Sequence, residues 1–142
     1  MKETLKISNI KYQISNCKLR RCAVNSEELS DRFLDYAASI ITLVKSLGNS
    51  YQGKHISKQL LRSATSCGAN YEEARAAESK ADFIHKLQIV LKELRESRFW
   101  IRLIKRASLI PKDKISPILS ETDELIKIIA KSVVTSKMKK II

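Results

Sequence analysis

Residues 59–104 read QLLRSATSCGANYEEARAAESKADFIHKLQIVLKELRESRFWIRLI, and the pattern of this stretch decides the fold. Apolar and small residues recur at alternating steps of three and four, which is the spacing of one face of an amphipathic helix. The recurrence breaks at ESKAD, where Ser79 or Asp82 can cap a second helix. The two lines are Ile56, Leu60, Ala64, Cys67, Tyr71 and Ala74, then Phe83, Leu87, Val90, Leu94, Ser97, Ile101 and Ile104. The stretch therefore predicts two antiparallel helices joined near residue 80.

The first of these helices has an unusual middle, with Ser63, Thr65, Ser66, Gly68 and Asn70. All five residue types are poor helix formers, so packing rather than propensity must favour them. Small residues on a helix face let two backbones approach closely, and polar residues beside that face can fix the pairing.

An antiparallel hairpin that turns near residue 80 places Ala64 opposite Ser97 and Cys67 opposite Leu94. The layer of Ala64 and Ser97 has almost no side-chain bulk, so we expect the two helices to lie close together there. Gly68 has no side chain, so we expect another neighbouring helix to approach closely there.

A polar flank runs beside each apolar line, and like flanks meet in an antiparallel pair. We expect Glu73 beside Lys86 and Ser66 beside Glu93, as a polar ladder that fixes the register of the two helices. An ordinary solvated flank has the same spacing and is the alternative. The two flanks are Gln59, Ser63, Ser66, Asn70 and Glu73 on the first helix and Lys86, Glu93, Glu96 and Trp100 on the second.

Trp100 and Leu103 end this flank with large apolar groups, beyond the seam of the hairpin. Such groups indicate that another surface covers them, so we expect them in a subunit interface.

Helical periodicity continues on both sides of the hairpin. NSEELSDRF predicts a helix start with Asn25 as cap and Glu28 three residues on, and LGNSYQGK ends that helix. A fourth apolar line follows the break at Pro111. With only 3 Gly and 2 Pro, the chain favours few, long elements. Residues 25–142 are therefore predicted to be all-α, as one antiparallel up-down four-helix bundle.

The first 24 residues form a basic N-terminal arm, with six Lys and Arg against one acid, Glu3. Its apolar residues alternate loosely, as in a strand, but a lone strand would have no partner in a helical protein. The residues predict an arm without fixed structure in isolation. A contact of Arg20 and Arg21 with nucleic acid or another partner is the alternative.

The net charge is +12 and the sequence pI about 9.8, which favours an acidic partner such as RNA or DNA. The alternative for the net charge is that it serves only solubility, and the alternative for charged stripes is that they are solvated helix faces. The candidate phosphate contacts form two helical stripes, Arg95, Arg98, Arg102 and Lys105 on one helix and Lys54, Lys58 and Arg62 on another. No apolar run approaches the about 20 residues that span a bilayer, so we expect no membrane partner.

The sequence holds no arrangement of residues typical of catalysis. His55 and His85 lie on different predicted helices without a carboxylate or thiol cluster, which argues against a metal site. There is no glycine-rich phosphate loop, and no serine has a base at a suitable spacing. We expect a non-enzymatic protein without cofactor. Cys17, Cys22 and Cys67 make an odd count that suits a reducing, cytoplasmic setting.

The stretch quoted above resembles the proteins encoded by intervening sequences in bacterial 23S rRNA genes, also called the S23 ribosomal protein family. Residues 59–104 carry the resemblance, with Ala64 where the family often has Gly, Cys67 where Ile is common, and Phe99 in place of Tyr. Residues 1–24 have no counterpart in the family pattern.

This resemblance implies a bundle that assembles into a homo-oligomer, typically a pentameric ring, with no catalytic activity. Accessory variability proteins of diversity-generating retroelements are similar in fold, and they bind nucleic acid and a reverse transcriptase. Two functions therefore stay open: an oligomer whose basic surface binds nucleic acid, and a protein-interaction scaffold such as an accessory subunit of a reverse transcriptase.

Overall fold

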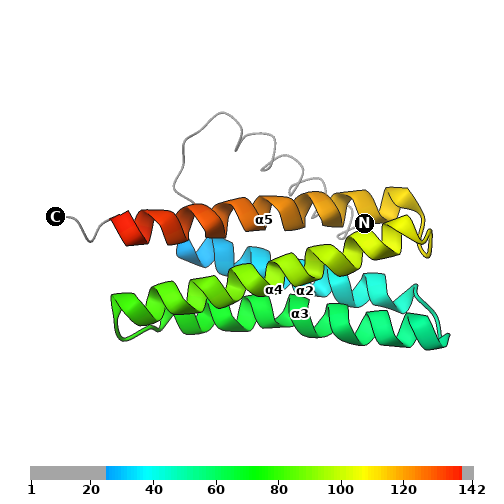
Figure 1. The fold of residues 1–142 in the computed structure, drawn as a ribbon, viewed down its shortest axis with the longest axis horizontal. Helices are drawn as coiled ribbons and strands as arrows, with labels where there is room; N and C mark the ends of the chain where they lie inside the picture. Colours follow the sequence, from blue (N-terminus) through cyan, green and yellow to red (C-terminus); the bar gives the residue numbers. More distant parts are fainter. Residues whose placement is uncertain (1–24, 139–142) are drawn as a thin grey trace, which may run out of the picture.

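A computed structural model describes residues 25–138 as four α-helices (Figure 1). Their bounds are α2 Ser26–Lys45, α3 Tyr51–Arg75, α4 Lys80–Arg106 and α5 Lys112–Met138. The helices run antiparallel in chain order, and each contacts its two neighbours in a closed bundle, α3 with α2 and α4, α5 with α4 and α2. The predicted all-α, up-down four-helix bundle is confirmed for this part of the chain.

Polar caps begin three of the helices. Asn25 Oδ1 accepts a hydrogen bond from the backbone N–H of Glu27 at 3.2 Å, and Glu28 Oε2 accepts one from the backbone N–H of Asn25 at 3.4 Å. This is the predicted capping box. Ser50 caps α3, and Ser79 rather than Asp82 caps α4 by accepting from the N–H of Asp82 at 3.1 Å.

α4 ends in a left-handed turn that is formed by serine rather than glycine. Ser108 has a φ of 54°, in the left-handed region that glycine usually occupies. The N–H of Leu109 donates to the carbonyl of Ile104 at 3.2 Å, and the N–H of Ser108 donates to the carbonyl of Lys105 at 3.2 Å. These two bonds form a Schellman motif, which turns the chain sharply toward α5.

The apolar lines predicted from sequence form one continuous core. Leu60, Ala64 and Cys67 of α3 and Leu94 and Ile101 of α4 are all 0% exposed. One position differs from the expectation, because Ile84 is buried near the start of α4 while Phe83 is only half-buried. Phe83 lies in the first turn of α4, at the rim of a surface hollow between the helix ends, where it packs partly against the core.

A layer of hydroxyl groups crosses this core, with contributions from all four helices. Tyr36 Oη and Thr122 Oγ1 are 3.0 Å apart, linking α2 to α5, and Ser97 Oγ and Ser63 Oγ are 2.9 Å apart, linking α4 to α3. The thiol of Cys67 donates to the carbonyl of Ser63. Burial raises the pKa of the Tyr36 hydroxyl well above its ordinary value, so this group stays neutral. Hydrogen-bonded hydroxyls in an apolar core define one pairing of the helices, because any slip would leave them unpaired.

Two glycines of α3 lie against neighbouring parts of the chain. A Cβ atom on Gly68 would lie 3.5 Å from Phe33 Cβ of α2, an ordinary contact. A Cβ atom on Gly53 would lie 2.5 Å from the carbonyl oxygen of Leu47 and 2.9 Å from Ser50 Oγ. The turn between α2 and α3 therefore requires glycine at position 53, whereas α2 tolerates a methyl group at position 68.

Candidate nucleic-acid interface

The α3–α4 pair has the register expected from sequence near the connecting turn, and a register close to it at the centre of the pair. Lys86 Nζ donates to Glu73 Oε2 at 2.5 Å, the pair that the sequence analysis placed together. Ser97 contacts Ser63, one position from the expected Ala64, while Ala64 itself is fully buried.

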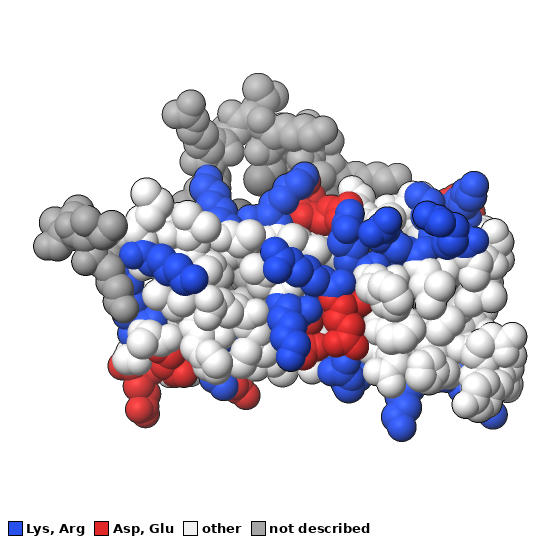
Figure 2. Space-filling view, viewed as in Figure 1, with Lys and Arg blue, Asp and Glu red and all other residues white. Residues whose placement is uncertain are grey.

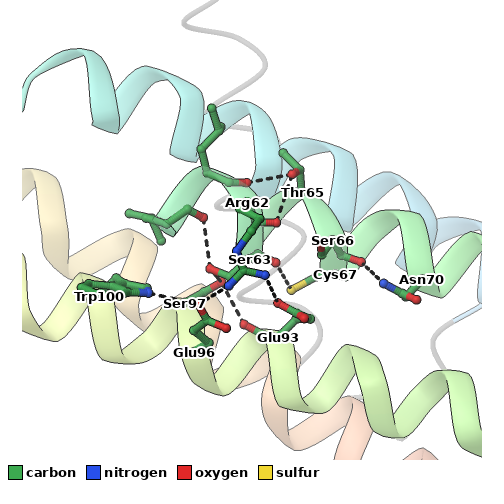
Figure 3. Close-up of polar contacts among 12 residues, drawn as sticks. Arg62, Ser63, Thr65, Ser66, Cys67, Asn70, Glu93, Glu96, Ser97 and Trp100 are labelled. Atoms are coloured by element: carbon green, nitrogen blue, oxygen red, sulfur yellow. Dashed lines mark hydrogen bonds and ion pairs between the residues drawn. The ribbon is translucent and has the colours of Figure 1, made fainter. Parts of the chain in front are cut away.

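Arg62 takes the place that we expected Ser66 to hold in the polar ladder. Its guanidinium pairs with Glu93 at 3.4 Å and with Glu96 (Figure 3). Hydrogen bonding to Arg62 lowers the pKa of Glu96, so this carboxyl stays ionised. The carbonyl of Ser66 instead accepts a bond from Asn70 Nδ2 within α3. Arg62 therefore contributes to the pairing of α3 with α4.

The predicted subunit-interface residues lie beside this ladder. Trp100 Nε1 donates to Glu96 Oε1 at 3.3 Å, and its ring packs edge-on against the rings of His55 and Phe99. Trp100 and Leu103 are both half-buried against the core, whereas Phe99 is 57% exposed. An aromatic surface thus lies on the flank of α4 that faces α3.

The basic stripe of α4 lies on the opposite flank, toward α5. Arg98 Nε donates to Asp123 Oδ1 of α5 at 2.6 Å, whereas Arg95 and Arg102 are exposed and Lys105 is half-buried. Because Arg62 faces the other flank of α4, the two predicted stripes do not form one surface.

The structure places most of these cations, with others, at one end of the bundle. This basic end comprises the last eight residues of α2 and α4, the first eight of α3 and α5, and the connecting turns. It holds eight cations and a single acid, Asp113. Figure 2 shows Lys and Arg side chains gathered there, where α4 turns into α5. The eight cations are Lys45, Lys54, Lys58, Arg102, Lys105, Arg106, Lys112 and Lys114.

The side chains at the basic end form no ion pair with any residue in the described range 25–138. The opposite end has six cations and seven acids, and it contains ion pairs such as Arg75–Glu72 at 3.2 Å and Lys86–Glu73. Residues 25–138 as a whole have 19 Lys and Arg against 14 Asp and Glu, a net charge of +5. The basic end therefore accounts for all of the net positive charge of the described bundle.

A surface hollow of about 360 Å³ opens at the basic end, between the last turns of α4 and the start of α5. Its lining residues are Arg102, Lys105, Arg106, Ser108, Lys112 and Leu119. Four of the six are cations, and none is an acid. A larger hollow of about 830 Å³ at the opposite end mixes Glu72 and Glu78 with Arg75 and Lys80.

Sequence reasoning located only part of the basic end. Lys54, Lys58, Arg102 and Lys105 were among the predicted contacts, and Arg20 and Arg21 lie outside the described residues. Lys45, Arg106, Lys112 and Lys114 were missed, because they flank turns rather than repeat along a helix. An up-down topology brings the α2–α3 and α4–α5 turns to the same end, so charge counted by turn would have found them.

The described residues contain no group of three His, Cys, Asp or Glu side chains that could hold a metal ion. None of the described helices combines the length and apolar character needed to cross a membrane.

These features define a class of protein, an all-α antiparallel bundle with a polar layer through its core and its cations at one end. The chain belongs to the 23S rRNA-intervening sequence protein family, whose family model matches residues 28–131. The resemblance seen in the sequence is thereby confirmed.

A solved structure agrees with this assignment. The crystal structure of a protein with unknown function from the S23 ribosomal protein family of Bacteroides thetaiotaomicron VPI-5482 is 39% identical to this chain, with a TM-score of 0.69. The match covers 73% of this chain and 96% of that chain. No curated protein matches the sequence.

Proposed function

We propose that this protein is a non-enzymatic, cytoplasmic homo-oligomer that binds RNA or DNA through the basic end of its bundle. The observation that carries the proposal is the group of eight cations at that end, none of them paired with a described residue. Elsewhere Arg62, Arg98 and Lys86 pair with carboxylates. Cations without a counter-charge at one end of the bundle are available to a polyanion.

Binding of this kind is electrostatic. Each Lys or Arg that neutralises a phosphate releases condensed counterions, so log affinity falls linearly with log salt, by about 0.7 per contact for single strands. The basic end carries no motif that reads base edges, and its cations contact phosphates alike in any sequence. We therefore expect weak sequence selectivity.

Oligomer formation is supported by the aromatic flank of α4. Phe99 is 57% exposed beside Trp100, and Leu103 continues this surface. Because the flank faces away from α5, a second copy can cover it and leave the hollow of the basic end open. A cyclic ring, five-membered as the family resemblance implies, would use this contact. Light scattering should give a mass several times 16.2 kDa, and a monomer at all micromolar concentrations would contradict it.

A protein scaffold, such as an accessory subunit of a reverse transcriptase, is the second candidate function. It is favoured by Leu34 and Ile41, which lie two turns apart on α2 and are 67% and 44% exposed. Apolar side chains at this spacing on one exposed helix face suit a protein partner.

Fluorescence anisotropy with labelled single-stranded RNA and DNA over a salt series tests the proposal. The variant Lys54→Gln, Lys58→Gln, Lys114→Gln removes three exposed cations from the basic end, outside the hollow. The matched control Lys92→Gln, Lys131→Gln, Lys137→Gln removes three exposed cations elsewhere.

The basic-end variant should bind all sequences more weakly and with a shallower salt dependence, while the control should bind nearly as tightly as the parent. Equal weakening in both variants would show that net charge, rather than the basic end, governs binding. An oligomer that leaves RNA and DNA unbound even at low salt would favour the protein scaffold.

A further inference from the structure

We propose that the hollow between α4 and α5 binds the terminal phosphate of a nucleic-acid strand. This proposal rests on the proposed function for the identity of the strand, and it adds a specific ligand group and a specific place. The hollow is lined by Arg102, Lys105, Arg106 and Lys112, together with Ser108 and Leu119.

The first argument is that four like charges share one concave surface with no counter-charge. None of the four forms an ion pair with a residue of the described bundle, and no carboxylate lines the hollow. Like charges held close together repel one another, and a bound anion removes this repulsion. At the opposite end of the bundle, the hollow lined by Arg75 and Lys80 also contains Glu72 and Glu78, so its cations have counter-charges within the protein.

The second argument is that the backbone brings the attachment points of these side chains together. Lys105 and Arg106 belong to the last turn of α4, where the Schellman motif at Ser108 fixes the direction of the chain. Lys112 is the first residue of α5, so that helix begins at the rim of the hollow. The N-terminus of α5 and the C-terminus of α4 both lie at the hollow, so their dipoles oppose one another and the positive field there comes from the cations. The hydroxyl of Ser108 supplies a further donor among the lining residues.

The third argument concerns the charge of the ligand. A phosphodiester within a strand carries a single negative charge, whereas a terminal phosphate carries about −1.5 to −2 at pH 7 because its second pKa is about 6. Two arginines, Arg102 and Arg106, can each offer a planar fork that matches phosphate oxygens. A volume of about 360 Å³ also leaves room for the attached sugar beside half-buried Leu119. Four cations around one hollow therefore suit a strand end better than a mid-strand phosphate.

The experiment compares oligonucleotides of one sequence that differ only at their ends. Internally labelled strands carry a 5′-phosphate, a 3′-phosphate or hydroxyls at both ends, and anisotropy gives the affinity of each for the full chain. Either the 5′-phosphorylated or the 3′-phosphorylated strand should bind about tenfold more tightly than the strand with hydroxyls at both ends. This difference in affinity corresponds to roughly one charge-assisted hydrogen bond.

Two variants locate the preference. Arg102→Gln with Lys112→Gln changes two exposed side chains of the hollow and should abolish the preference for the phosphorylated strand. Lys54→Gln with Lys58→Gln changes two exposed cations of the basic end outside the hollow. This control should weaken all three strands alike and leave the preference intact.

The outcomes separate this inference from the proposed function. If the strands bind with equal affinity whatever their ends, or if both variants keep the preference, the terminal-phosphate site is wrong while nucleic-acid binding stands. If no strand binds, the proposed function is wrong. Thermal melts with inorganic pyrophosphate then test whether the hollow binds a phosphate group. A rise in Tm for the parent but not for the Arg102→Gln, Lys112→Gln variant would support a phosphate site, and an unchanged Tm in both would refute it.

Discussion

Replacing each of two glycines of α3 by alanine should change the stability of the bundle in opposite directions. Gly68 has room for a methyl group, since its Cβ would lie 3.5 Å from Phe33 Cβ. Gly53 has none, since its Cβ would lie 2.5 Å from the backbone oxygen of Leu47. The same chemical change in one helix thus tests the packing of two different surroundings.

The expected sizes follow from these contacts. In a helix interior alanine is more favourable than glycine by about 1 kcal/mol, so Gly68→Ala should raise the free energy of unfolding by about 0.5–1 kcal/mol. Gly53→Ala must displace the α2–α3 turn and weaken the cap in which Ser50 Oγ accepts from the N–H of Gly53 at 3.1 Å. Overpacking and a damaged cap each cost about 1–2 kcal/mol, so this variant should lose about 2 kcal/mol net.

Urea unfolding followed by circular dichroism, at one fixed protein concentration, measures both variants. With an m value of about 2 kcal/mol/M, the two midpoints should differ by more than about 1 M. Ala69→Gly, at an exposed position of α3, measures the propensity cost alone and should lose about 1 kcal/mol. Midpoints that shift in the same direction, or a Gly53→Ala protein as stable as the parent, would refute the reasoning.

Three further predictions concern single residues. Ala64→Leu should lower the free energy of unfolding by about 1–3 kcal/mol, because Ala64 is 0% exposed between helices, and an unchanged melt would contradict this packing. Ser108→Gly should raise Tm by relieving about 1 kcal/mol of left-handed strain at a φ of 54°, and calorimetry would show no gain if that conformation were unstrained. Burial raises the pKa of the Cys67 thiol to about 12, so above pH 9 the unfolded chain loses this proton while the folded chain keeps it. Stability should therefore fall as pH rises from about 9, and Cys67→Ala should make the fall shallower in urea titrations at pH 8 to 11; an identical slope would exclude this cause.

The fold was predictable because helical periodicity is a local property of the chain. The alternating steps of α3 and α4 place apolar side chains on one face whatever surrounds them, and Asn25 and Ser79 mark where two helices begin. The pairing of Glu73 with Lys86 followed from the position of a single turn. Each of these inferences needs only one helix or one hairpin.

The features that sequence reasoning missed depend on contacts across the whole bundle. The hydroxyl layer needs Tyr36 of α2 and Thr122 of α5 at the same height, which no local pattern specifies. Arg62 was predicted in a basic stripe of candidate phosphate contacts, because its partners Glu93 and Glu96 lie on another helix. The basic end likewise appears only when separate turns are brought together.

The concentration of cations at one end changes what the net charge means for this protein. A helix of 27 residues such as α4 is about 40 Å long, whereas ionic screening at physiological salt acts over about 8 Å. A charged molecule near one end therefore scarcely senses the other, and the net charge of +5 of residues 25–138 understates the local field at the basic end. A polyanion that diffuses toward the bundle is drawn to this end before any contact forms, so the encounter is already oriented. Moving a cation from one end to the other would leave the isoelectric point unchanged and still alter the rate of association.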